Sequence, residues 1–183
     1  MKTSLITIAA VWMLSATMAS AAPKAHEHGA VKLDVAIDGA TVTIGLEASL
    51  DSLLGYERTP RNDKERRAAA DLLSRLRAGT GLFGMDAGAQ CSLSKSEVQA
   101  PVLEPAAKDA TPATPRDKAK DEHADLDASF AYTCVQPQQL RTLDVGLFQA
   151  FGRIQRIDVQ VVGPKGQSKA TLKRPARAVV LQK

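Results

Sequence analysis

All three histidines of this chain lie in two short segments that also carry carboxylates. His26 and His28 belong to the sequence Ala-His-Glu-His-Gly at residues 25–29, and His123 lies two residues before Asp125. Imidazole and carboxylate together are common ligands of divalent zinc and of neighbouring metals such as copper, nickel and cobalt. A metal site at these residues requires that the two segments meet in the folded protein.

Alternation of apolar residues indicates which strand faces carry these ligands. The odd positions of residues 31–37 are apolar, so extending this strand backwards puts His26 and His28 together on the opposite, polar face. In residues 126–134 the even positions are mostly apolar and are expected to face inward. The odd positions, continued back to residue 123, lie on the opposite, polar face. The side chains expected on that face are His123, Asp125 and Asp127. The alternative interpretation is that His-x-His is a solvated tail and His123 an ordinary surface residue.

The first 22 residues have the pattern of a cleaved signal peptide. Lys2 gives a positive start, residues 5–18 are largely apolar, and Ala-Ser-Ala at residues 19–21 has the small-x-small form of a cleavage site. The apolar run of about 14 residues is shorter than the roughly 20 that a membrane-spanning helix needs. We therefore expect residues 1–22 to be removed, with no stable membrane insertion, and the mature chain to be periplasmic.

The remaining residues, 23–183, are enough for a single domain of ordinary size. The formal net charge is +4, and the excess is concentrated late in the chain. The basic residues there are Arg153, Arg156, Lys165, Lys169, Lys173, Arg174 and Arg177. Because they alternate with apolar residues and aromatic side chains are few, they predict a solvated strand face and no nucleic-acid binding.

The predicted elements give an α+β fold, a mostly antiparallel β-sheet with one main helix and short extra helices. Residues 31–37 and 42–48 alternate around Asp38-Gly39, a strong signal for a hairpin. A loop is expected through residues 53–56. Asn62 or Asp63 then begins a helix that ends before Gly79.

The later elements are shorter. Short helices are expected near residues 137–140 and 145–151, and strands near residues 157–161, 168–172 and 178–181. Residues 100–121, rich in proline, alanine and lysine, predict a mobile loop inside the one domain.

The two cysteines, Cys91 and Cys134, predict one structural disulfide. In an oxidising compartment two cysteines favour such a pair. Cys91 begins one predicted strand and Cys134 ends another, so antiparallel pairing of these strands brings them together. A Cys-x-x-Cys redox pair and a thiolate metal site are the alternatives, and neither spacing is present.

Over nearly its whole mature length the chain resembles the ZrgA-like periplasmic proteins associated with bacterial zinc uptake. The resemblance rests on short segments that occur in the expected order. They are residues 25–29 with the strand 31–37, residues 53–57 (Leu-Leu-Gly-Tyr-Glu), residues 123–126 (His-Ala-Asp-Leu), residues 132–134 (Tyr-Thr-Cys), residues 143–148 (Leu-Asp-Val-Gly-Leu-Phe) and the strand 157–162.

This resemblance implies periplasmic zinc binding that supplies or assists an uptake transporter, with His26, His28 and His123 as ligands and Asp125 as a fourth. The chain departs from the family pattern at two places. Residues 100–120 contain no histidine where many relatives have a histidine-rich acidic run, and Arg58 stands where relatives often have histidine. The departures favour a single site over a high-capacity zinc buffer.

We expect no enzymatic activity, since no nucleophile–base arrangement, phosphate loop or carboxylate pair stands out. The competing hypothesis is a periplasmic adaptor that binds a protein partner through its sheet edge or basic tail and has no metal role.

Overall fold

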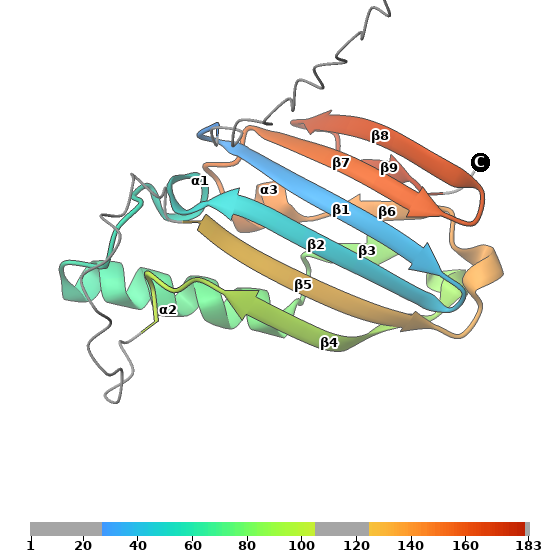
Figure 1. The fold of residues 1–183 in the computed structure, drawn as a ribbon, viewed down its shortest axis with the longest axis horizontal. Helices are drawn as coiled ribbons and strands as arrows, with labels where there is room; N and C mark the ends of the chain where they lie inside the picture. Colours follow the sequence, from blue (N-terminus) through green and yellow to red (C-terminus); the bar gives the residue numbers. More distant parts are fainter. Residues whose placement is uncertain (1–26, 105–124, 182–183) are drawn as a thin grey trace, which may run out of the picture.

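Two β-sheets form the framework of the protein, shown in Figure 1 as a computed structural model that describes residues 27–104 and 125–181. The larger sheet has the strand order β4-β5-β2-β1-β7-β8, and the smaller has the order β3-β6-β9. The strands of the larger sheet are β1 (Ala30–Asp38), β2 (Thr41–Ser49), β4 (Cys91–Gln99), β5 (Asp125–Cys134), β7 (Arg156–Gly163) and β8 (Gly166–Lys173). Only β1 and β7 are parallel among these pairs, so the mostly antiparallel α+β prediction is confirmed.

The hairpin β1–β2 lies at the centre of the larger sheet, as its alternation predicts. Val31 pairs with Ala48 and Asp38 with Thr41, and Gly39 turns the chain with φ of 55°. The apolar positions of both strands are buried, because they face the interior of the domain. The polar positions between them face the other side of the sheet, which no described element covers.

The main helix, α2 (Asp63–Ala78), begins and ends where the sequence predicts. The Asn62 side chain accepts a hydrogen bond from the Glu65 backbone N–H, and Gly79 closes the helix with φ of 65°. Leu72 and Leu76 are buried on the side that faces the sheet interior. Together with the smaller sheet, α2 therefore covers one face of the larger sheet (Figure 1).

The predicted disulfide is present between Cys91 and Cys134, with a Sγ–Sγ distance of 2.01 Å. The two cysteines are register partners in the antiparallel pair β4–β5. The same pair carries Phe130, whose ring packs edge-on against Phe83 at a centroid distance of 5.2 Å. This contact joins the larger sheet to the smaller one across the core.

Several short elements differ from the expectations. Residues 50–54 form a helix, α1 (Leu50–Leu54), where a loop through residues 53–56 was expected. The smaller sheet was not predicted, because its strands are too short to show alternation. Its strands are β3 (Phe83–Met85), β6 (Thr142–Val145) and β9 (Ala178–Val180), the last at the predicted edge position.

The predicted short helices are present as η2 (Pro137–Gln139) and α3 (Leu147–Ala150), and one further turn, η1 (Ala87–Ala89), was not predicted. The expected signal peptide, residues 1–22, and most of the expected loop at 100–121 lie outside the described residues. Within residues 27–104 and 125–181, no helix is long and apolar enough to cross a membrane.

Candidate metal centre

A turn, rather than an extension of β1, carries His28. β1 begins at Ala30. Gly29, directly before it, has φ of 77°, a left-handed conformation that is not part of an extended strand. The Ala30 N–H donates to the Glu27 carbonyl oxygen at 3.0 Å and closes the turn. The expected backward extension of the strand is therefore wrong at His28. His26 lies outside the described residues.

This turn is held in place by contacts with two other parts of the chain. The Gly29 N–H donates to Ser52 Oγ at 2.9 Å, and the Gly29 carbonyl accepts from the Arg156 N–H at 3.0 Å. The Glu27 carboxylate accepts two hydrogen bonds, at 2.8 and 2.7 Å, from the Arg156 guanidinium. These hydrogen bonds lower the pKa of Glu27 below its usual value. His28 therefore projects from a positioned backbone.

The His28 imidazole lies between two carboxylates that come from different segments. Its Nδ1 is 3.4 Å from Asp51 Oδ2, and its Nε2 is 3.6 Å from Glu57 Oε1. The imidazole is 62% exposed, whereas the two acidic side chains are only 19% and 18% exposed. Sequence reasoning named neither acid as a candidate ligand.

Both acids lie around the short helix α1, and its capping residues were the signal that sequence reasoning missed. Ser49 caps the start of α1, with its side chain accepting from the Ser52 N–H, and Gly55 ends the helix with φ of 88°. Asp51 is in the first turn, and Glu57 follows two residues after Gly55. The two capping residues are a serine and, six residues later, a glycine, and the helix lies between them.

Asp125 is the first residue of β5 and is placed at the same end of the sheet. Strands β1 and β5 both run antiparallel to β2, so they begin at the same end, next to α1 (Figure 1). They flank β2, which sets them about 10 Å apart. Asp125 pairs in register with Ser49, and one of its carboxylate oxygens is buried. The predicted parity is confirmed from Asp125 onward; His123 lies outside the described residues.

Arg58, which follows Glu57, forms part of a structural ion pair. Its guanidinium donates to both Glu65 carboxylate oxygens, at 2.7 and 3.0 Å, and stacks over the Tyr56 ring at 4.8 Å from the centroid. These hydrogen bonds, with one from the Arg61 N–H, lower the pKa of Glu65 to about 2. Arg58 thus fixes the loop after α1 to the start of α2.

Most arginines late in the chain bind specific groups within the protein, while Arg153 and Arg174 remain exposed, as expected of a solvated basic surface. Arg156 binds Glu27, and Arg177 forms an ion pair with Asp144. Arg174 donates to the Gly152 and Ile154 carbonyl oxygens at 3.1 and 3.0 Å, and Arg153 binds Asp51. The lysines of β8, Lys169 and Lys173, are exposed as expected.

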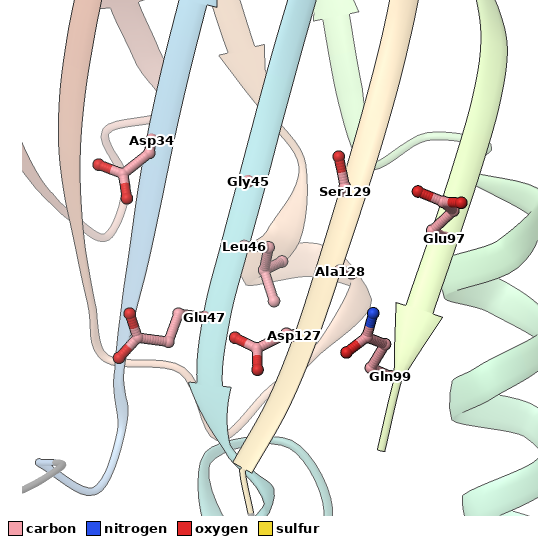
Figure 2. Close-up of a pocket in the computed structure, with 9 residues that line it drawn as sticks. All are labelled: Asp34, Gly45, Leu46, Glu47, Glu97, Gln99, Asp127, Ala128 and Ser129. Atoms are coloured by element: carbon pink, nitrogen blue, oxygen red, sulfur yellow. The ribbon is translucent and has the colours of Figure 1, made fainter. Parts of the chain in front are cut away.

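The uncovered face of the larger sheet has a separate acidic depression of about 320 Å³ (Figure 2). Its carboxylates are Asp34, Glu47, Glu97 and Asp127, each from a different strand. Glu47 forms an ion pair with Lys32, Glu97 forms one with Lys95 at 2.8 Å, and Asp34 accepts from Gln160 at 3.3 Å. These pairings are typical of a solvated sheet face.

Within residues 27–104 and 125–181, no group of three or more histidine, cysteine or acidic side chains is arranged to hold a metal ion. The described residues around His28 therefore contribute at most part of a metal centre.

The model of a family described as "ZrgA family zinc uptake protein" matches residues 25–181 of the chain. The match begins just before the turn that carries His28 and ends just after β9, so it covers both sheets and every described element. No curated protein matches the chain at a significant level.

Proposed function

Since the chain belongs to the family of ZrgA zinc uptake proteins, we propose that it is an exported, non-enzymatic protein that binds zinc and assists zinc uptake. The observation that carries the binding proposal is the placement of His28. A turn fixed by Ser52 and Arg156 presents its imidazole between two carboxylates, at the sheet end where β5 also begins. Imidazole and carboxylate groups at one position are suited to zinc.

The proposed ligands are His26, His28, His123 and Asp125. In the sequence His26 is two residues from His28 and His123 is two residues from Asp125, and two residues of chain span at most about 7 Å. His28 lies two residues before β1 and Asp125 begins β5, and these two strands lie about 10 Å apart. Both histidines are therefore tethered within reach of the same sheet end.

Zinc is the cargo in this proposal. Its binding requires neutral imidazoles, so zinc affinity should fall as the pH drops through the range in which histidines protonate. Copper, nickel and cobalt accept the same ligands, and the family description favours zinc among them. A single site is proposed, because residues 100–120 contain no histidine that would add capacity.

The proposed location is the periplasm, after removal of residues 1–22 as a signal peptide. The disulfide between Cys91 and Cys134 supports this location, because such bonds persist in oxidising compartments. A protein that binds zinc there needs a recipient, and a zinc uptake transporter is the proposed partner.

Calorimetric titration of zinc into residues 23–183 tests the binding proposal. We expect one zinc per chain for the unaltered protein, and loss of that binding in the double variant His26→Ala/His28→Ala. Glu97→Gln, on the uncovered sheet face, is the control and should bind like the unaltered protein. No binding heat above buffer, or unchanged binding in the double variant, would overturn the proposal.

A further inference from the structure

The two ring nitrogens of His28 face two different carboxylates, so those carboxylates have different roles. Nδ1 lies near Asp51 and Nε2 lies near Glu57. The lone pairs of the two nitrogens point away from each other, and one metal ion binds only one of them. A neutral imidazole carries its proton on the other nitrogen, and a carboxylate can accept a hydrogen bond from that N–H group. One carboxylate is thus placed to bind the same metal ion as His28, and the other is placed to orient the imidazole ring.

Charge around Asp51 assigns it the orienting role. Its Oδ1 lies 3.4 Å from the Arg153 guanidinium, which also donates to the Asp51 backbone carbonyl at 2.9 Å. Its Oδ2 faces His28 Nδ1, so both carboxylate oxygens already face positive or donor groups. A divalent cation bound at Nδ1 would also lie close to the Arg153 charge, which would repel it.

The distance between His28 and Glu57 fits two ligands of one zinc ion. With Zn–N and Zn–O bonds near 2.0–2.2 Å and a tetrahedral angle, the two ligating atoms lie about 3.4 Å apart. Nε2 and Glu57 Oε1 are 3.6 Å apart, and that oxygen is buried beside an imidazole that is largely exposed.

We propose that His28 binds zinc through Nε2 together with a carboxylate oxygen of Glu57, while Asp51, fixed by Arg153, accepts a hydrogen bond from Nδ1–H and orients the imidazole. This inference rests on the proposed function, since it assigns roles within a zinc site. Glu57 takes the carboxylate position that the proposed function gives to Asp125, so the zinc ion keeps four ligands. A carboxylate behind a ligating histidine raises the basicity of the imidazole and reduces the freedom it loses on binding.

The test compares zinc affinities of two isosteric variants with matched controls. Asp51→Asn removes the charge that orients His28, and zinc affinity should fall about 10–100-fold. Glu57→Gln replaces a ligand by a weakly binding amide, and the loss should be at least as large. The controls are Asp127→Asn and Glu97→Gln, on the uncovered sheet face, which should keep the affinity of the unaltered protein.

A second readout separates ligand roles from a loss of folding. Long-range ¹H–¹⁵N spectra of the zinc-loaded protein should show His28 with a protonated Nδ1 and a metal-bound Nε2. Metal on Nδ1, or affinities of Asp51→Asn and Glu57→Gln equal to their controls, would overturn this inference and leave zinc binding itself standing. Absence of zinc binding in the unaltered protein would overturn the proposed function together with it.

Discussion

Replacement of Ser52 by alanine removes a hydroxyl that joins three segments beneath the candidate metal centre. The side chain is fully buried, at 0% exposure. Its Oγ accepts from the Gly29 N–H at 2.9 Å, lies 2.9 Å from Ser49 Oγ and donates to the Ala30 carbonyl at 3.4 Å. In the variant the buried Gly29 N–H loses its acceptor, which costs about 1–3 kcal/mol.

A loss of about 2 kcal/mol should lower the melting temperature by about 4–8 °C for a chain of this size. Urea unfolding followed by circular dichroism measures the free energy directly. The matched control is Ser74→Ala, an exposed serine on α2, which should stay within about 0.5 kcal/mol of the unaltered protein. Zinc affinity should also fall for Ser52→Ala, because the turn that presents His28 loses its attachment to α1.

Comparing the two variants separates the loss of the Gly29 hydrogen bond from the general effect of replacing a serine by alanine. Equal free energies of unfolding for Ser52→Ala and Ser74→Ala, at an unchanged slope against urea, would show that the Gly29 contact contributes nothing measurable. The turn would then be held by its other contacts alone, and the stability argument for the site would be wrong.

Three further changes follow from contacts outside this turn. Replacing both Cys91 and Cys134 by alanine removes a bond between residues 43 apart and should lower the free energy of unfolding by about 4 kcal/mol in urea, in the chain-entropy model. Hydrogen bonds from Arg58 and from the Arg61 N–H lower the pKa of Glu65 from 4.5 to about 2, so the charged form of Glu65 stabilises the fold above pH 4.5 and this contribution is lost as the pH falls toward 2. In the Glu65→Gln variant, the melting temperature should lack the part of its pH dependence that comes from the Glu65 carboxylate. A melting temperature that falls with pH as it does in the unaltered protein would contradict this role of Glu65. Gly55→Ala forces φ of 88° on a residue with a side chain and should cost about 1–2 kcal/mol by the same unfolding assay, whereas an unchanged stability would mean that the helix end relaxes.

Local patterns were enough to predict the elements whose residues specify their own structure. The β1–β2 hairpin follows from strict alternation around Asp38-Gly39, and α2 follows from its apolar stripe and from Asn62 and Gly79 at its ends. The disulfide follows from the same logic, because alternation fixes the strands that flank Cys91 and Cys134.

The turn at His28 shows how a local rule failed. Alternation over residues 31–37 shows which residues form the strand but not at which residue the strand begins. Gly29 adopts a positive φ, so the extended backbone does not continue from the strand back to His28. The sequence itself indicates this strand boundary, because a glycine lies just before the strand. The consequence is that His28 points toward α1 instead of lying on the open sheet face.

The partners of His28 depended on contacts between distant segments. Arg153 reaches Asp51 across 102 residues of sequence, and Arg156 reaches Glu27 across 129. Such pairs are set by the parallel β1–β7 pairing and the packing of α1, which leave no periodic signal in one sequence. Periodicity therefore located the candidate histidines but could not show which carboxylates surround them.

Crystals of residues 23–183 grown with zinc, with diffraction recorded on both sides of the zinc absorption edge, would locate the metal ion in the protein. We expect one strong anomalous peak at the sheet end where β1 and β5 begin, within about 2.2 Å of His28 Nε2 and of a Glu57 oxygen. A peak in the acidic depression between Glu47 and Asp127, or no peak at zinc concentrations that saturate binding in solution, would contradict it.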